Sequence, residues 1–198
     1  MLELFKPVKP MLCRYWYVKK LFNRTDRVGC EIKFDGIRAM IHKKDDDVKI
    51  FSRSLKDITN DFSYLIPDIQ KAVQNDVILD CELISDKFGN LIPAITHKDV
   101  EIDARFAVFD IIYLDGKDIT GYQLYKRKKF LEDILTPNGK IFIVDQVVCK
   151  NIDEIRKFFI QTIKNGQEGI IVKRLDSEYY ANSTYRSYCW IKCKPRRD

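Results

Sequence analysis

The stretch Glu31-Ile32-Lys33-Phe34-Asp35-Gly36-Ile37-Arg38-Ala39-Met40 decides the predicted fold. It starts within an apolar run, residues 28–33, that predicts a short strand, and Asp35-Gly36 predicts a tight turn. Alternate residues from 37 to 41 are apolar, as in a second strand. The pattern predicts a hairpin that holds the Lys33 amine half-buried at its mouth, a setting typical of a nucleophilic lysine. The pattern is short, and ordinary hairpins with an incidental lysine share it.

Length and composition indicate one globular domain. The 198 residues are 45% hydrophobic, and no stretch approaches the roughly 18 apolar residues that cross a bilayer. Residues 1–6 lack the layout of a signal peptide, so we expect a cytoplasmic protein, or a nuclear one in a eukaryote, that is not secreted. Six scattered cysteines and two histidines predict reduced thiols without a zinc site. The net charge of +6 is compatible with a polyanionic partner but does not require one.

The rest of the chain predicts strands interrupted by helices. Strands are expected at residues 48–51, 77–84, 105–114, 141–148, 169–173 and 189–194, helices at 58–75, 124–135 and 151–164, a short helix at 17–23, and a polar loop at 85–103. This order favours an α+β fold with mainly antiparallel sheets. The eight dispersed glycines form no phosphate-binding loop, so side chains would have to hold the phosphates of a nucleotide.

Four charged residues fall where strands should be buried. Glu82 lies inside one predicted strand, and Glu168 directly precedes another. Lys192 and Lys194 alternate with apolar residues, so both face one side of the last strand. Burying such charges costs several kcal/mol each unless they are paired or meet a ligand. They therefore predict either structural salt bridges between these glutamates and lysines or a site for a charged ligand.

Six short motifs occur in order along nearly the whole chain. They are Lys33–Arg38, Ser52–Ser54, Leu79–Glu82, Phe109–Gly116, Glu168–Lys173 and Trp190–Lys194. Together they resemble the covalent nucleotidyltransferases, which include ATP-dependent DNA ligases, RNA ligases and mRNA capping enzymes. The form Phe-Asp-x-x-Tyr-Leu-Asp-Gly and the ending Tyr185-Arg186-Ser187 look most like DNA ligases. The resemblance implies a nucleotidyltransferase (ATP-grasp-like) fold, with mainly antiparallel sheets flanked by helices and the nucleotide in a cleft between them.

The resemblance also implies that Lys33 is the catalytic nucleophile. In the family this lysine attacks the α-phosphate of ATP, forms lysyl-AMP and releases pyrophosphate. The AMP then passes to the 5′-phosphate of nicked DNA before the strand is sealed. A protonated amine cannot attack, so we expect desolvation and nearby cations to favour the neutral amine. Carboxylates beside Lys33 would favour the protonated amine instead, unless a metal ion neutralises their charge.

The nucleotide contacts follow from the same resemblance. Glu31 would accept a hydrogen bond from the adenine amino group and favour ATP over GTP, and Ile32 would lie beside the nucleotide. Phe109 would stack on adenine, although its apolar neighbours also suit a core position. Glu82 is assigned to the ribose, and Lys192 and Lys194 to the α-phosphate. Arg38, Arg53 and Arg186 are assigned either to the nucleotide or to the phosphate at the nick. Glu82 and Glu168 would bind Mg²⁺, which prefers oxygen ligands, and a role for Lys173 stays open.

The expected domain covers residues 1–198, and an oligonucleotide-binding (OB) domain, which full ligases carry after the last motif, is not expected within them. The chain could be an excised domain or a natural minimal form. In either case we expect a monomer that binds ATP, self-adenylates slowly and seals nicked double-stranded DNA poorly. Two alternatives stay open: an RNA ligase or capping guanylyltransferase, and a non-catalytic nucleic-acid-binding module that keeps the fold. The sequence does not distinguish roles in repair, replication and end joining.

Overall fold

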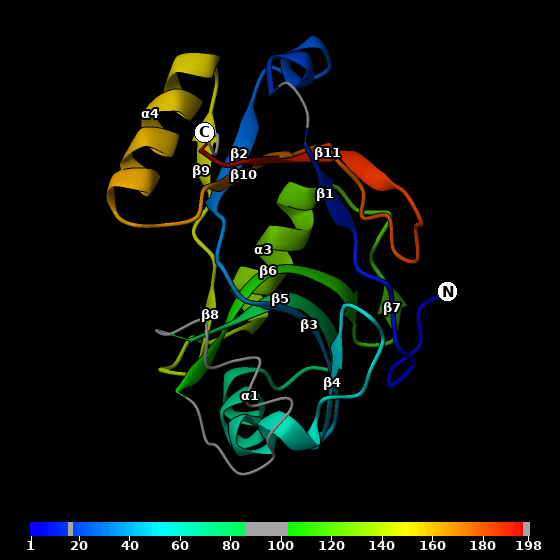
Figure 1. Cartoon of the computed structure of the whole chain (residues 1–198). Helices are drawn as coiled ribbons and strands as arrows, with labels where there is room; N and C mark the ends of the chain where they lie inside the picture. The colour runs from blue at the N-terminus through cyan, green and yellow to red at the C-terminus, as the bar shows by residue number, and fades with distance from the viewer. Residues whose placement is uncertain (16–17, 86–102, 196–198) are drawn as a thin grey trace.

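Two β-sheets form the framework of the molecule (Figure 1). The computed structural model describes residues 1–15, 18–85 and 103–195, so nearly all of the expected loop at 85–103 and the start of the expected helix at 17–23 lie outside the described residues. The first sheet has the order β1 (Leu12–Arg14), β11 (Arg186–Cys193), β10 (Ile170–Arg174), β2 (Val28–Ile32) and β9 (Val147–Cys149). The second has the order β4 (Asp47–Ser52), β3 (Ile37–Lys44), β5 (Val77–Ser85), β6 (Ala104–Leu114) and β7 (Lys117–Asp118), and β8 (Ile141–Ile143) pairs with β6.

The pairing is mainly antiparallel, as the sequence predicts. Only the pairs β1–β11 and β6–β8 are parallel among the described strands. The helical elements are η1 (Val18–Asn23), η2 (Asn60–Leu65), α1 (Ile66–Ala72), α3 (Leu124–Ile134) and α4 (Ile152–Lys164). The predicted helix at 58–75 is thus divided into η2 and α1, with Pro67 in the first turn of α1, where its missing N–H is tolerated. The predicted α+β class is confirmed.

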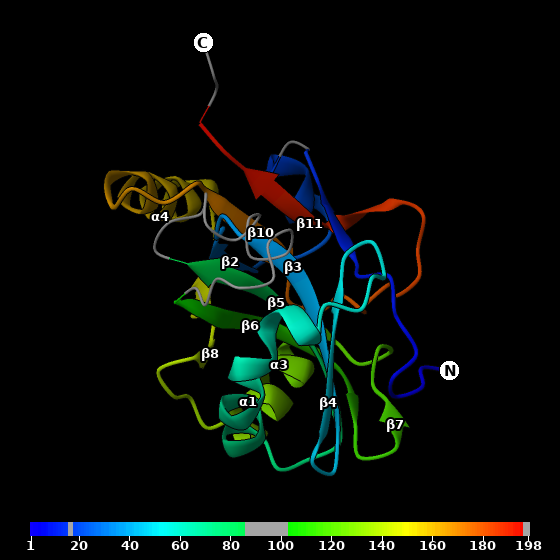
Figure 2. The same cartoon turned by 60° about the horizontal axis from the view of Figure 1, so that its bottom comes forward.

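Helices cover the outer faces of both sheets (Figure 2). β3 has two buried faces, because successive side chains of a strand point to opposite sides. Ala39 and Ile41 pack on one face, in a core shared with residues of α1 and α3. Met40 packs on the other face, in a second core that includes Trp190 of the first sheet. A third core joins β2, β10 and β11 to α4 and η1. Asn151 caps the N-terminus of α4, because its side chain accepts a hydrogen bond of 2.9 Å from the Glu154 N–H. Within the part of the chain that the structure describes, no helix has the length and apolar character to cross a membrane.

The hairpin predicted around Asp35-Gly36 is wrong. β2 pairs with β10 and β9, whereas β3 pairs with β4 and β5. Residues 33–36 instead carry the chain from the first sheet to the second, and the Lys33 N–H donates to the Gly169 carbonyl at 2.9 Å. Gly36 is required because the backbone at this position lies close to the backbone of β5, and not because it forms a turn. A Cβ there would lie 2.2 Å from the Leu83 carbonyl oxygen.

The strand predicted at 141–148 is also divided between the two sheets. β8 pairs with β6 in the second sheet, and β9 pairs with β2 in the first. Residues 144–146 therefore form a second crossing, close to the crossing at 33–36. Its Gln146 side chain lies against Gly29 of β2. The two crossings place polar side chains where the sheets approach each other.

Candidate active site

A cleft of about 520 Å³ lies between the two sheets. Ten residues predicted from the sequence line it: Glu31, Ile32, Lys33, Arg38, Arg53, Glu82, Phe109, Arg186, Lys192 and Lys194. Glu168, the remaining predicted residue, contacts two of them directly. The structure thus gathers side chains from positions 31 to 194 around one cavity.

Lys33 follows β2 directly and projects into this cleft. Its Nζ donates a hydrogen bond to Glu168 Oε2 and lies 3.4 Å from the Phe34 carbonyl oxygen. The Lys194 Nζ donates to the other oxygen of Glu168. The side chains of Lys33 and Glu168 are each 21% exposed, so the amine is half-buried but reachable from the cleft. Of the salt bridges predicted as one alternative, the one between Glu168 and Lys194 is present. The second lysine at Glu168 is Lys33, so one carboxylate brings two lysines to the same point.

Glu82 lies on β5, directly opposite Arg38 of β3. Burial is the largest influence on its carboxyl group and raises its pKa to about 7, although the positive charges of Arg38 and Lys33 counteract it. A carboxyl group with this pKa changes its charge near neutral pH. A cation beside it would favour the charged form of the carboxyl group, and a phosphate would favour the neutral form.

Arg38 is held by a carboxylate to which the sequence analysis gave no role. Its Nε and Nη2 atoms donate to the two oxygens of Asp80 at 2.5 and 2.6 Å, and Nη2 also donates to the Met11 carbonyl at 3.1 Å. Asp80 is fully buried and accepts a further hydrogen bond of 2.5 Å from the Tyr179 hydroxyl. The signal that could have found Asp80 is the one used for Glu82, a carboxylate inside an apolar strand.

Aromatic rings form the floor of the cleft beneath Arg38. The guanidinium carbon lies 4.5 Å from the centroid of the Phe109 ring, and Phe109 meets Trp190 edge to face at 6.1 Å. The Lys173 Nζ lies 4.2 Å from the Trp190 ring and 4.6 Å from the Phe109 ring. Burial lowers the pKa of Lys173. Trp190 lies in the last of the six motifs, but no role was predicted for it from the sequence.

Glu31 forms the inner wall and is only 2% exposed. Its Oε1 accepts hydrogen bonds from Lys128 Nζ at 3.2 Å and Gln146 Nε2 at 2.9 Å, and its Oε2 lies 2.5 Å from Lys173 Nζ. Three donors from three separate elements therefore fix this carboxylate. Neither Lys128 nor Gln146 was predicted from the sequence, because a lysine on an amphipathic helix and a glutamine in a half-buried strand ordinarily face solvent.

The outer rim of the cleft is positively charged. Arg186 Nη1 donates to the Cys13 carbonyl at 3.1 Å, and Arg53 is exposed in the turn after β4. The Lys192 Nζ lies 3.9 Å from the centroid of the Tyr15 ring. Burial and then the charge of Arg186 lower the pKa of Lys192. A rim of this kind attracts phosphate groups.

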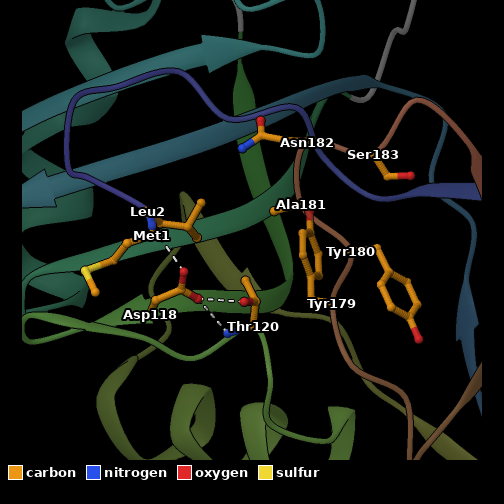
Figure 3. A pocket seen from close by; sticks show the side chains of 9 residues that line it. All are labelled: Met1, Leu2, Asp118, Thr120, Tyr179, Tyr180, Ala181, Asn182 and Ser183. Atoms are coloured by element: carbon orange, nitrogen blue, oxygen red, sulfur yellow. Dashed lines mark hydrogen bonds between the residues drawn. The ribbon is translucent and has the colours of Figure 1, made fainter.

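A second hollow lies beside the N-terminal residues (Figure 3). Asp118 accepts hydrogen bonds there from the N–H groups of Leu2 and Thr120, both at 3.1 Å, and from the Thr120 hydroxyl at 2.6 Å. None of the site residues predicted from the sequence lines this hollow. Its polar contacts anchor the N-terminal segment.

Comparisons with known proteins agree with this architecture. The family described as ATP dependent DNA ligase domain matches residues 10–194. The chain therefore belongs to the ATP-dependent DNA ligase family, which confirms the resemblance found in the six motifs.

The curated relatives are named DNA ligases. A probable DNA ligase of Dictyoglomus turgidum is 35% identical over 207 residues, which cover 97% of this chain and 35% of the relative. A DNA ligase of Sulfolobus acidocaldarius is 32% identical over 208 residues, again 97% of this chain and 35% of the relative. The chain thus spans about 35% of the length of these relatives.

Solved structures show the same fold. A mycobacterial DNA ligase D complexed with ATP and MES superimposes with a TM-score of 0.76 at 25% identity, over 98% of this chain and 62% of that chain. A Chlorella virus DNA ligase-adenylate gives a TM-score of 0.70 at 20% identity, over 94% and 67%. The predicted nucleotidyltransferase fold is confirmed.

Proposed function

We propose that this chain is the adenylation domain of an ATP-dependent DNA ligase, with Lys33 as the nucleophile. The observation that carries the proposal is the meeting of Lys33, Glu168 and Lys194 in one half-buried cleft between the sheets. Family membership supports ATP as the substrate. AMP carried on Lys33 would then pass to the 5′-phosphate of nicked double-stranded DNA, after which the phosphodiester bond is sealed.

The first step requires Lys33 to lose its proton and its contact with Glu168. The neutral amine then attacks the α-phosphorus of ATP, an N–P bond forms, and the bond to the bridging oxygen breaks as pyrophosphate leaves with its electron pair. The attacking nitrogen then loses a second proton to solvent, which leaves the single N–H of the lysyl-AMP phosphoramidate. Lys194 and Lys192 would stabilise the charge that develops on the α-phosphate oxygens. Their positions at the cleft wall suit this role, because Lys194 is already held beside Lys33 through Glu168.

The base would occupy the inner part of the cleft. Phe109 offers a ring face for adenine, a contact worth about 1–3 kcal/mol. Glu31 would accept a hydrogen bond from the adenine amino group. A carboxylate at this point favours adenine over guanine, because guanine presents a carbonyl acceptor where adenine presents a donor.

Mg²⁺ fits the donors that the cleft offers, because carboxylate oxygens are its preferred protein ligands. Glu82 and Glu168 would hold it. No group of three or more histidine, cysteine, aspartate or glutamate side chains suited to a metal occurs among residues 1–15, 18–85 and 103–195, so phosphate and water oxygens would supply the other ligands. When bound, the ion would neutralise phosphate charge and compete with the lysines for Glu168.

The basic rim would contact DNA. Arg53 and Arg186 are both exposed and both line the mouth of the cleft, and their planar guanidinium groups suit phosphate oxygens. Because the curated relatives are nearly three times longer than this chain, we propose that an OB domain cooperates with it in sealing. We further propose that the protein acts as a monomer, in the cytoplasm or nucleus.

Intact-mass spectrometry after incubation with ATP or GTP and Mg²⁺ tests this proposal against its rivals. We expect an AMP adduct with ATP and little or no GMP adduct with GTP. A GMP adduct would indicate a capping guanylyltransferase instead, and no adduct with either nucleotide would favour a binding module. Nicked DNA and nicked RNA, supplied separately to the adenylated protein, distinguish a DNA ligase from an RNA ligase by which substrate accepts the AMP.

A further inference from the structure

The Glu31 carboxylate depends for its position on residues outside the six motifs. Its Oε1 accepts from Gln146 Nε2 at 2.9 Å, the shorter of the two hydrogen bonds to that oxygen. Gln146 belongs to the crossing between β8 and β9, on the side of Glu31 that faces a separate groove lined also by Lys128 and Lys129. It therefore supports the wall of the nucleotide cleft without lining the cleft itself.

Gly29 makes this contact possible. A Cβ at Gly29 would lie 2.5 Å from Cδ, 2.7 Å from Nε2 and 2.9 Å from Cγ of Gln146. The Gln146 side chain thus crosses β2 where the strand has no side chain, two residues before Glu31. Any larger residue at position 29 must displace the Gln146 amide, because real Cβ atoms do not approach other atoms this closely.

We propose that Gln146 is a positioning residue for base selection, and that Gly29 provides the space it needs. A carboxylate discriminates adenine from guanine only while its direction is fixed. Lys128 and Lys173 also bind Glu31, but as compact charges that tolerate several carboxylate orientations. The Gln146 amide adds a directional hydrogen bond to one oxygen. This inference rests on the proposed role of Glu31 at adenine.

The test measures binding rather than catalysis, so that it is independent of adenylation. Dissociation constants for α,β-methylene-ATP and α,β-methylene-GTP, whose α–β bridge cannot be cleaved to transfer AMP or GMP, are measured by titration calorimetry. The proteins are the full chain, Gln146→Leu and Gly29→Ala. The matched controls are Gln161→Leu, whose Nε2 donates to Asn165 at 3.0 Å on the exposed face of α4, and Gly121→Ala, where an added Cβ has no neighbour within 4 Å.

We expect both test variants to reduce the preference for the adenine analogue by about tenfold, the effect of losing one hydrogen bond to a charged group. Both controls should keep the wild-type ratio. Thermal unfolding of every variant separates a loss of stability, which would weaken both analogues equally, from a loss of selectivity. An unchanged ratio in folded Gln146→Leu, or a wild-type chain that binds both analogues equally, would overturn the inference. Selective binding without any lysyl-AMP would instead count against the proposed function alone.

Discussion

The Nζ atom of Lys33 donates a hydrogen bond to the Oε2 atom of Glu168, which lies 135 residues further along the chain. The second oxygen of Glu168 accepts from Lys194. One carboxylate thus joins the proposed nucleophile to a proposed phosphate-binding lysine. Its contacts must change when Lys33 attacks, and a metal ion that binds Glu168 would favour that change.

Glu168→Gln tests this double role. The amide keeps the shape of the side chain but is a poor Mg²⁺ ligand, so we expect adduct formation with ATP to slow by about 100-fold. The Mg²⁺ concentration for half-maximal rate should also rise. The measurement is the rate of adduct formation over a Mg²⁺ series, with Glu178→Gln, an exposed carboxylate after β10, as the control. An unchanged Mg²⁺ requirement in Glu168→Gln would remove Glu168 from the metal site.

Asp80 should be essential for stability. Asp80→Ala leaves the Arg38 guanidinium without its buried counter-charge, and breaking such a pair costs about 3–5 kcal/mol in the free energy of unfolding. Urea denaturation measures the loss. Asp153→Ala, which removes a carboxylate that is 88% exposed in the first turn of α4, is the control and should change little. Equal stability of the two variants would show that the Arg38–Asp80 pair contributes little.

His42 predicts a dependence of stability on acid pH. It is fully buried, its Nδ1 accepts from the Phe5 N–H at 3.1 Å, and burial lowers its pKa from 6.5 to about 4. Between these values the unfolded chain binds more protons than the folded one, so the free energy of unfolding falls as the pH drops from 6.5 to about 4. The expected slope for this residue is up to about 1.4 kcal/mol per pH unit.

His42→Leu isolates this effect. The variant should be less stable at pH 7, because the Phe5 N–H loses its acceptor, but its stability should fall less steeply with acid. Urea denaturation at several pH values between 7 and 4 gives both slopes. Identical slopes would mean that His42 does not titrate in this range.

Local sequence patterns predicted the positions of the strands and helices better than they predicted which strands pair with each other. The alternation around Ala39 and the helical pattern at 151–164 depend on neighbours in sequence, and both agree with the structure. The Asp35-Gly36 hairpin failed because the turn signal carries no information on which sheet each strand joins. The prediction of one continuous strand at residues 141–148 failed for the same reason. In both cases the chain changes sheet where a local pattern predicts continuity.

The residues of the site fall into the same two groups: those that a local pattern predicts and those that depend on contacts between distant segments. Glu82 and Glu168 were found because a charge in an apolar strand is costly without a partner. Lys128 gave no such signal, because it lies on the amphipathic helix α3, where a lysine is expected in solvent. Its burial comes from the crossing at residues 144–146, where the Val144 carbonyl accepts from its Nζ at 2.6 Å. Contacts created by packing between distant segments cannot be read from either segment alone.

The most direct test of the central claim is to locate the adduct within the chain. The protein is first treated with pyrophosphate and Mg²⁺ to remove any bound AMP, then incubated with ATP and Mg²⁺, digested and analysed by tandem mass spectrometry. We predict one AMP adduct, on Lys33, with no adduct in Lys33→Ala and an unchanged yield in the control Lys164→Ala at the exposed end of α4. An adduct on another residue, or one that persists in Lys33→Ala, would contradict the assignment of Lys33 as the nucleophile.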